Sequence, residues 1–327
     1  MMKASSFACV LLLYCFSSFA QTADSVVLQT PGGAVFGTLT VPAIKGPLPV
    51  ALFIAGSGPT DRDGNNPLMK NNSLKFLGEA LNAQGIATLR YDKRGIAAST
   101  NAGGKEADLR FDTYVNDASA LISSLKADKR FSKVIVIGHS EGSTIGMKAA
   151  SMAKADAMIC VAGPGSSADK VLRTQLNENL DPSKAVSPEA GEQMRQSREL
   201  INHMLDTLVT GDTLRFVPIS MYSLFRPSVQ PYLISWFRYD PQQLIKALTI
   251  PVLIVQGTTD LQVKEADAEL LYQANPKASK VIIPNMNHVL KQSEAEPRAN
   301  HATYIDPALP VAPALTDAVI SFIKKLK

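Results

Sequence analysis

The 327-residue sequence contains few cysteines and no cluster of basic residues. Its three cysteines are Cys9, Cys15 and Cys160. The 33 lysines and arginines are scattered along the chain, and 29 acidic residues reduce the net charge to +4. This distribution argues against a nucleic-acid-binding surface and against a polybasic membrane patch. Internal repeats and low-complexity tracts are also absent from the sequence, whose 46% hydrophobic content is typical of a globular protein with a substantial core.

One apolar run stands apart at the N-terminus. Lys3 precedes the apolar residues 7–16, and small residues follow at Ser18 and Ala20. Their spacing fits positions −3 and −1 of a cleavage site after Ala20, which is the pattern of a secretory signal peptide. The run is too short to span a bilayer. We therefore expect residues 1–20 to be a signal peptide, and the mature protein to be exported, periplasmic or secreted, without a transmembrane segment.

Two other interpretations of the N-terminus are weaker. A lipoprotein signal would require a small residue before Cys15, where the sequence has the bulky Tyr14. A buried N-terminal helix is the remaining alternative. Cleavage after residue 20 would remove Cys9 and Cys15, so the mature chain would have no internal disulfide. Cys160 lies in an apolar strand pattern, and we expect it to be a small core residue and not a nucleophile.

Runs of apolar residues of strand length alternate with segments of helical periodicity over most of the chain. Runs bounded by turn residues predict strands, and apolar residues at helical spacing predict helices. The alternation predicts crossover connections, and therefore an α/β fold with a mostly parallel sheet flanked by helices. The predicted strands are 25–30, 34–42, 50–56, 86–92, 134–137, 157–163, 250–257 and 280–285, and the predicted helices are 74–84, 111–127, a segment after Ser140, 264–274 and 314–326.

The alternation is interrupted at residues 165–247. This segment has helical stretches such as 188–209 and an aromatic-rich part, 216–239, but no convincing buried strand. Because the sheet needs strands from both sides of the segment, a separate second domain is the weaker interpretation. We expect residues 165–247 to be a helical cap inserted into one core made of residues 21–164 and 248–327.

A lone serine lies between two glycines where a predicted strand meets a predicted helix. The stretch Gly138-His139-Ser140-Glu141-Gly142 has the G-x-S-x-G pattern of a nucleophile elbow. Glycines on both sides indicate a backbone turned too sharply for side chains nearby. Such a turn would raise the Ser140 hydroxyl above the edge of the sheet, so we predict Ser140 to be a catalytic nucleophile.

A serine nucleophile needs a base, and the sequence has four histidines. His139 lies inside the elbow, His203 lies in a helical stretch of the insertion, and His301 lies in a proline-rich loop. His288 follows a predicted sheet strand directly. Because loops after parallel strands gather at the carboxyl edge of the sheet, beside the elbow, we predict His288 to be the base. The alternative is a loop histidine satisfied by hydrogen bonds, which would leave Ser140 without a partner.

The base needs an orienting carboxylate. Asp260 lies three residues past the predicted strand 250–257. It would complete the chain order Ser140, Asp260, His288, which is that of α/β-hydrolases. Asp267, inside the following helix, is the second candidate. Asp260 could also cap that helix, and this role is compatible with the first.

Charge on a substrate carbonyl oxygen must be met by N–H donors that are already in place. One predicted donor is the backbone N–H of Glu141, next to the nucleophile at a helix start. The second is the backbone N–H of Ser57, because Gly56 and Gly58 on either side would let this backbone approach a ligand closely. The alternative is a glycine turn without a catalytic donor.

With these motifs, the chain resembles the α/β-hydrolase superfamily over nearly all of its mature length. The resemblance rests on GHSEG, on GTTD and NHVL, and on two longer stretches, AGSGPTDRDGNN and YDKRGIAAST. The longer stretches resemble bacterial carboxylesterases related to the serine-aminopeptidase-like hydrolases. Ala97 departs from the glycine often found there, which bears on the conformation of a loop. The resemblance implies hydrolysis of a small-molecule ester through an acyl-enzyme, without a metal or an organic cofactor.

Other functions remain open on the same fold. A serine peptidase would need an acidic pair in the cap to hold a free amino terminus, and nothing marks Glu178, Glu192 or Glu199 for that role. An acyltransferase would use the same triad with a different acceptor. A catalytically inactive binding protein is the alternative of another class, which an intact triad argues against.

The expected acyl-binding residues lie in the aromatic part of the cap. Apart from the loop at 57–73, the loops at the catalytic edge look short, so little else could enclose an acyl chain. We expect Phe225 and Trp236 to line an apolar pocket. The alternative is that these side chains pack the cap onto the core.

Overall fold

The computed structural model describes residues 21–326, so the predicted signal peptide, 1–20, lies outside the described residues. Within the described range, eight strands form one sheet in the order β1-β2-β4-β3-β5-β6-β7-β8. The pairs β1–β2 and β2–β4 are antiparallel, and every other neighbouring pair is parallel. The predicted, mostly parallel sheet is confirmed. The strands are β1 Gln21–Thr30, β2 Gly33–Pro42, β3 Leu48–Ile54, β4 Ala87–Tyr91, β5 Phe131–His139, β6 Ala157–Val161, β7 Val252–Gly257 and β8 Ser279–Ile283.

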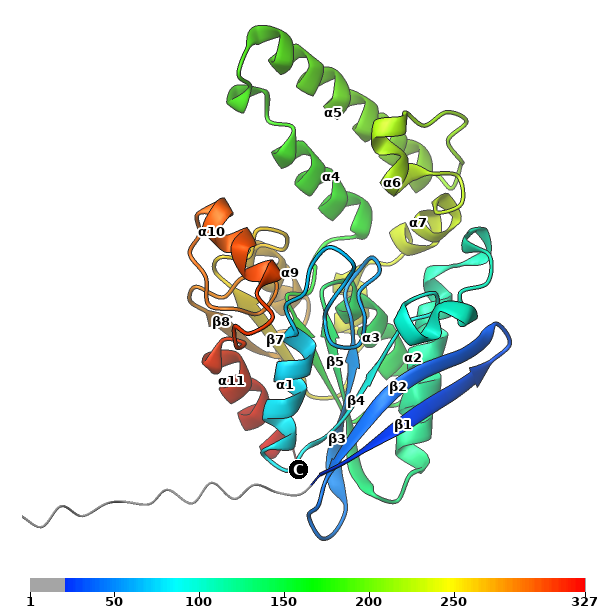
Figure 1. Cartoon of the computed structure of the whole chain (residues 1–327), viewed down its shortest axis with the longest axis vertical. Helices are drawn as coiled ribbons and strands as arrows, with labels where there is room; N and C mark the ends of the chain where they lie inside the picture. Colours follow the sequence, from blue (N-terminus) through cyan, green and yellow to red (C-terminus); the bar gives the residue numbers. More distant parts are fainter. Residues whose placement is uncertain (1–20, 327) are drawn as a thin grey trace, which may run out of the picture.

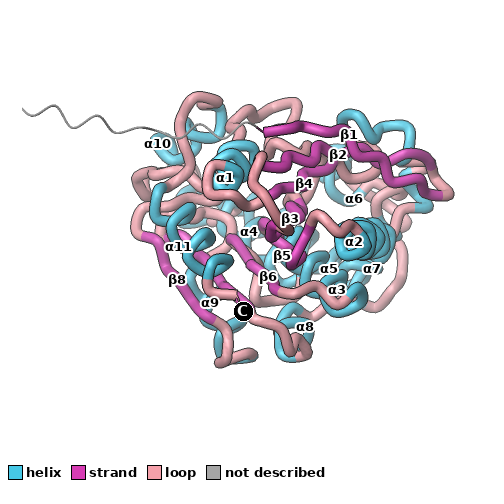
Figure 2. The backbone as a smooth tube through the Cα atoms, turned by 90° about the horizontal axis from the view of Figure 1, so that it is seen from below, coloured by secondary structure: helices cyan, strands magenta, loops and turns pink. Residues whose placement is uncertain are grey.

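Helices cover both faces of the sheet, as the view along the sheet in Figure 2 shows. Leucine, valine and isoleucine side chains of α1 and α11 pack on one face. The opposite face is covered by α2, α3 and α9. These helices are α1 Ser73–Asn82, α2 Phe111–Ala127, α3 Glu141–Ala153, α9 Glu265–Ala274 and α11 Pro313–Lys324. A further short helix, α10 Pro297–Ala302, precedes α11.

The order of the central strands explains where a site can form. β3 lies between β4 and β5, so consecutive parallel strands are laid down on opposite sides of it. In open α/β sheets, such a reversal opens a crevice at the carboxyl ends of the strands. Residues 134–137 of β5 are buried on both faces, which accounts for their continuous apolar sequence. The residue that follows β5 is Ser140, at this edge.

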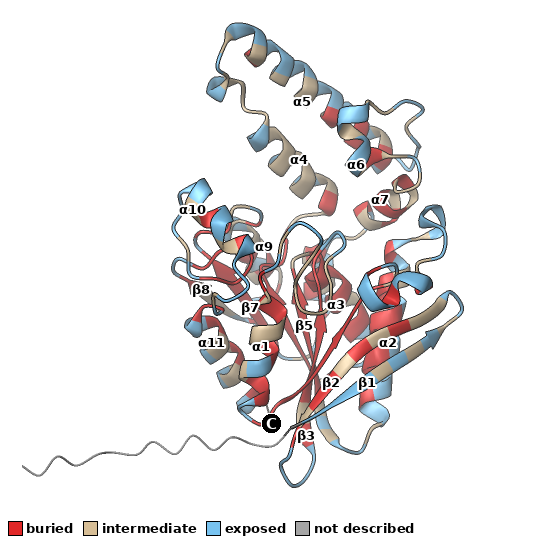
Figure 3. Ribbon diagram, in the orientation of Figure 1, coloured by how far each residue is buried: buried red, intermediate tan, exposed pale blue. Residues whose placement is uncertain are grey.

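Residues 162–251, between β6 and β7, contain helices but no strand. In Figure 1, α4 and α5 project from the body as two long helices, which we call the distal arm. Figure 3 shows that much of this arm is exposed or half-buried, whereas the central strands of the sheet are buried. At the end of the segment, α8 packs against α3 and α9 of the core. The helices of the segment are α4 Ala168–Asn179, α5 Pro188–Val209, α6 Tyr222–Phe225, α7 Gln230–Phe237 and α8 Pro241–Lys246.

Two details differ from the sequence-based expectation or extend it. β1 begins at Gln21, four residues before the predicted strand, because it pairs with β2 along its whole length, as far as Pro42. Among residues 21–326, no helix combines the length and the apolar character that crossing a bilayer would require.

Candidate active site

Ser140 lies at the sharp turn between β5 and α3. Its backbone has φ 56° and ψ −125°, a conformation that non-glycine residues rarely adopt. Such strain costs about 1–3 kcal/mol and persists only where the surrounding structure enforces it. Here the enforcing contacts include hydrogen bonds from Ser140 N–H to Val161 O (3.0 Å) and from Ser143 N–H to Ser140 O (2.9 Å).

The two glycines of the elbow are required by close backbone contacts. A Cβ atom at Gly138 would lie 2.3 Å from the carbonyl oxygen of Gly142. A Cβ atom at Gly142 would lie 2.1 Å from the carbonyl oxygen of Ile54, at the end of β3. Neither contact is sterically possible, so the helix can approach the strands this closely only with glycine at both positions. The spacing of the motif is therefore a packing requirement of the turn that presents Ser140.

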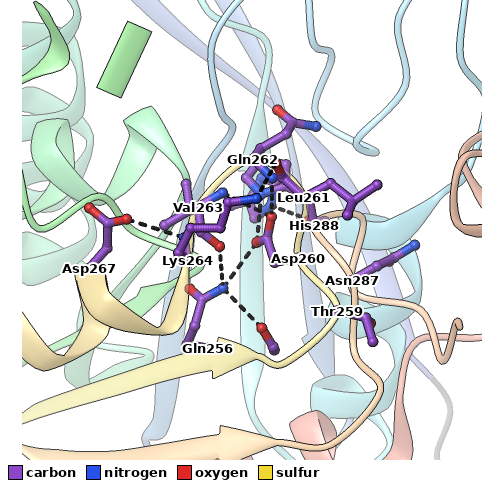
Figure 4. A network of polar contacts seen from close by, with 12 residues as sticks. Gln256, Thr259, Asp260, Leu261, Gln262, Val263, Lys264, Asp267, Asn287 and His288 are labelled. Atoms are coloured by element: carbon purple, nitrogen blue, oxygen red, sulfur yellow. Dashed lines mark hydrogen bonds and ion pairs between the residues drawn. The ribbon is translucent and has the colours of Figure 1, made fainter. Parts of the chain in front are cut away.

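Asp260 and His288 form a buried hydrogen-bonded pair, shown in Figure 4. His288 Nδ1 lies 2.8 Å from Asp260 Oδ2, and Gln256 Nε2 donates to the same oxygen at 3.1 Å. The backbone N–H groups of Gln262 and Val263 donate to Oδ1 at 2.8 and 3.0 Å. Asp260 therefore orders the turn before α9 and holds His288 at the same time.

The pKa of Asp260 lies below its usual value. Burial alone would raise the pKa, but the positive charge and hydrogen bond of His288 and the two backbone N–H donors outweigh it. The Asp260 carboxylate therefore engages Nδ1 of His288, and Nε2 is the ring nitrogen left for a nucleophile.

A second set of contacts positions the loop that carries His288. Asn287 Oδ1 accepts a hydrogen bond from the backbone of Lys291, and its Nδ2 donates to Asn300 and Thr303. His139 Nε2 lies 2.8 Å from the carbonyl oxygen of His288. Burial first, and then the nearby His288, lower the pKa of His139 to about 3, so its ring is neutral and donates through Nε2.

His139 also links the elbow to this loop. The rings of His139 and His288 lie side by side with 4.8 Å between their centroids, and His139 directly precedes Ser140. The Ser140 hydroxyl makes no hydrogen bond within the described range, 21–326. In enzymes without bound substrate, contacts between nucleophile and base are often loose and tighten in the reactive complex.

The other sequence candidates lie away from this arrangement. Asp267 accepts hydrogen bonds from the backbone N–H groups of Gly165 and Lys264, so it caps α9 and ties it to the loop between β6 and α4. His203 on α5 and His301 on α10 are exposed. Burial raises the pKa of the Cys160 thiol to about 12, which leaves it protonated in the core. Within residues 21–326, no group of three His, Cys, Asp or Glu side chains is placed to hold a metal ion.

Both predicted N–H donors lie close to Ser140. Glu141 is the first residue of α3, and the first N–H groups of a helix have no acceptor within it. Ser57 is exposed, and its N–H makes no hydrogen bond to any described residue. A Cβ atom at the preceding residue, Gly56, would lie 3.1 Å from Ser140 Cβ. The Ser57 backbone is therefore close to Ser140, where its N–H could donate to the carbonyl oxygen of a bound substrate.

A pocket of about 730 Å³ borders both Ser57 and Glu141. Trp236 lines it, as expected, and stacks on Phe111 with 5.9 Å between ring centroids. Phe225 does not line it: its side chain is 1% exposed and packs inside the insertion. The remaining apolar walls come from the insertion and from the loop after β4, through Ile96, Leu109, Leu172, Leu224, Val229 and Leu233.

The expectation that only the loop at 57–73 is long at the catalytic edge was wrong, because the loop after β4 is also long. Residues 92–110 connect β4 to α2 and contribute Arg94, Ile96, Glu106 and Leu109 to the pocket. The loop at 57–73 is therefore not the only long connection at the catalytic edge. The loop contains short helical turns at 97–102 and 106–108.

Comparisons with known proteins agree with the fold. Residues 71–204 match the family model described as serine aminopeptidase, S33. The esterase EstD of Thermotoga maritima is 27% identical over 265 residues, which cover 80% of this chain and 59% of that protein. Est1E of Butyrivibrio proteoclasticus, solved with ferulic acid bound, has a TM-score of 0.56 and 17% identity over 92% of this chain and 98% of its own. A hydrolase from Pseudomonas aeruginosa has a TM-score of 0.55 and 16% identity, covering 92% and 98%.

The structural matches show the same fold at low identity, and the chain spans 59% of the length of EstD. The sequence matches add a family model and an esterase relative. In its fold and in its sequence matches, the chain is similar to α/β-hydrolases, esterases among them.

Proposed function

We propose that the protein hydrolyses carboxylic esters through an acyl-enzyme formed on Ser140. The observation that carries this proposal is the buried Asp260–His288 pair, held at the same sheet edge as a serine in a strained elbow. The esterase relative supports the substrate class.

In the proposed mechanism, Ser140 Oγ bonds to the carbonyl carbon of the ester while its proton passes to His288 Nε2. Asp260 holds the ring and stabilises the imidazolium. The N–H groups of Ser57 and Glu141 donate to the oxyanion. Collapse of the intermediate breaks the bond to the alcohol, which leaves with the proton from His288. A water molecule, deprotonated by His288, then releases the carboxylic acid and restores Ser140.

The charges around the pocket favour an ester over a peptide with a free amino terminus. Of the residues lining the pocket, Glu106 and Glu141 are the acidic ones. Glu106 is paired with Arg226 and also accepts from Ser228, and Glu141 is paired with Lys93. The hydrogen bond from Arg226, above all, lowers the pKa of Glu106. A substrate ammonium group would have to displace one of these partners.

The apolar walls suggest where the acyl group binds. Leu172, Leu233 and Trp236 come from α4 and α7, so the insertion supplies one side of the pocket. We propose that this side, and not the sheet, sets the preferred acyl length.

The test compares p-nitrophenyl esters of graded acyl length with aminoacyl-nitroanilides, using the wild type and Ser140→Ala. We expect ester turnover by the wild type and a loss of up to about a millionfold in kcat in the variant. A fluorophosphonate probe should label the wild type and not the variant. Retention of more than about a tenth of the wild-type activity in folded Ser140→Ala would refute the assignment of the nucleophile.

Faster turnover of nitroanilides than of esters would instead favour the peptidase alternative. Transfer of the acyl group to an added alcohol in preference to water would favour an acyltransferase. Neither catalysis nor probe labelling would be seen with an inactive binding protein.

We also propose export, from Lys3, the apolar run and the small residues before Gln21. Mass spectrometry of the extracytoplasmic protein should find Gln21, free or cyclised, as the first residue. Detection of Met1, or of a lipid on Cys15, would contradict this proposal.

A further inference from the structure

Lys93 is a buried lysine directly behind the proposed oxyanion donors. Its Nζ donates to the carbonyl oxygen of Gly56 at 2.6 Å and to Glu141 Oε2 at 2.9 Å. It also lies 4.9 Å from the centroid of the Tyr114 ring. Lysine is rarely this buried, and Lys93 is only 1% exposed, so its three partners must offset the cost of removing the charge from water. None of the steps proposed above uses this lysine.

The hydrogen bond to Gly56 fixes the direction of the Ser57 N–H. The Gly56 carbonyl and the Ser57 N–H belong to one peptide unit, and the described chain contains no cis peptide bond. In a planar trans peptide, the C=O and N–H bonds point in opposite directions. Because Lys93 holds the carbonyl on its own side, the N–H must point away from Lys93. Without this contact, the glycines at 56 and 58 would let the peptide rotate.

The same ammonium group also fixes the second donor residue. Lys93 binds one carboxylate oxygen of Glu141, and the hydroxyl of Tyr232 on α7 donates to the other. Burial first, and then the Glu141 charge, raise the pKa of Tyr232 well above its usual value, so the hydroxyl keeps its proton. One lysine is therefore hydrogen-bonded to the backbone that carries the first donor and to the side chain of the residue that carries the second.

We propose that Lys93 is a positioning residue of the oxyanion hole, which aims the Ser57 N–H and anchors Glu141. This inference rests on the ester hydrolysis proposed above. Lys93 is among the residues that line the pocket, but its Nζ is engaged by the Gly56 carbonyl, by Glu141 and by the Tyr114 ring. In the proposed role, Lys93 therefore acts through the peptide backbone and not through contact with the substrate.

The first test replaces the three hydrogen-bonded side chains by apolar ones of similar size, in the triple variant Lys93→Met/Glu141→Leu/Tyr232→Phe. Removing both charges and the tyrosine hydroxyl together avoids leaving one buried charge unpaired. Loss of a whole oxyanion donor costs about a hundredfold to a thousandfold in kcat, so a misaimed donor should cost about tenfold to a hundredfold. We expect this loss in kcat with KM changed by less than about twofold. Affinity for a trifluoromethyl ketone analogue of the transition state should fall by the same factor as kcat/KM.

Two further variants separate positioning from general stability. Lys93→Arg keeps the charge opposite Glu141 but replaces the compact ammonium by a planar fork, and it should show the same selective loss of kcat. Asn82→Leu removes buried hydrogen bonds to Ile86 and Thr88 at the end of α1, away from the pocket. It should lower the unfolding midpoint and leave kcat within about twofold of the wild type.

The outcomes distinguish this inference from the proposed function. If Ser140→Ala abolishes turnover and a folded Lys93 variant keeps kcat within about twofold, the positioning role is refuted and the esterase assignment stands. A rise in KM at constant kcat would also refute it, because that result would place Lys93 in substrate binding. If Ser140→Ala itself retains turnover, the proposed function fails, and the inference fails with it.

Discussion

Polar groups at the carboxyl edge of the sheet and polar groups in the distal arm differ in how closely they are surrounded. Asp260, at the edge, is 5% exposed and accepts hydrogen bonds from four donors. In the arm, Arg173 on α4 is paired with Asp206 on α5, but the Asp206 side chain is 70% exposed. Ala168 is the one buried residue among those described in α4.

Because of this difference, the carboxyl edge of the sheet can hold a strained backbone in place, whereas the distal arm cannot. The backbone of Ser140 keeps its unfavourable angles because strands and helices pack against it from several sides. The arm is packed mainly at one end, where Ile201, Leu205 and Leu208 of α5 are buried. Segments with few buried contacts open locally at a lower free-energy cost. The chemistry is therefore expected to depend on the edge, and the arm to matter only where it reaches the pocket.

The largest expected effect comes from breaking the edge itself. His288→Ala should lower kcat about as much as Ser140→Ala, by up to about a millionfold, and Asp260→Asn by about ten-thousandfold. Since the residues act as a unit, the loss in the double variant His288→Ala/Asp260→Asn should be far smaller than the product of the single losses. Steady-state kinetics on a p-nitrophenyl ester measures all three.

The control for this prediction is His203→Ala, on the exposed face of α5. It should keep wild-type kinetics. A normal rate in His288→Ala together with an inactive His203→Ala would overturn the assignment of the base.

A smaller effect is expected where the insertion meets the pocket. A buried methylene contributes about 0.8 kcal/mol, so each acyl carbon that fits the pocket should raise kcat/KM up to about fourfold. Trp236→Ala enlarges the pocket and should shift the preferred acyl length upward, with acetyl ester turnover nearly unchanged. Phe225→Ala should instead lower the free energy of unfolding by about 3–5 kcal/mol without changing the length profile, because Phe225 is buried in packing.

The measurement is kcat/KM across esters of increasing acyl length, with thermal unfolding of each variant. Trp236→Ala and Phe225→Ala serve as controls for each other. A shifted profile in Phe225→Ala, or an unshifted one in folded Trp236→Ala, would contradict the division between pocket wall and packing.

Much of the fold follows from the sequence because strand and helix patterns are local. The alternation predicted the sheet, and the glycines around Ser140 predicted the turn. Contacts between distant residues were not predictable in this way. Lys93 and Glu141 are 48 residues apart and meet only because β3 lies between β4 and β5. The aromatic content of 216–239 likewise could not predict which side chain lines the pocket. Trp236 lines it, whereas Phe225 is buried inside the insertion.

The smallest effect is expected in the distal arm. A substitution there tests whether this loosely packed part of the insertion is independent of the catalytic edge. Arg173→Ala removes the ion pair with Asp206, which is worth at most about 1 kcal/mol because the carboxylate is well exposed. The arm reaches the pocket through Leu172, which is half-buried and packs against the apolar core, so its position should not depend on this pair. We therefore expect kcat and the acyl-length profile to stay within about twofold of wild type, measured with the same ester series. A clear shift in the profile would mean that the arm moves as a lid over the pocket, and the two regions would then be coupled.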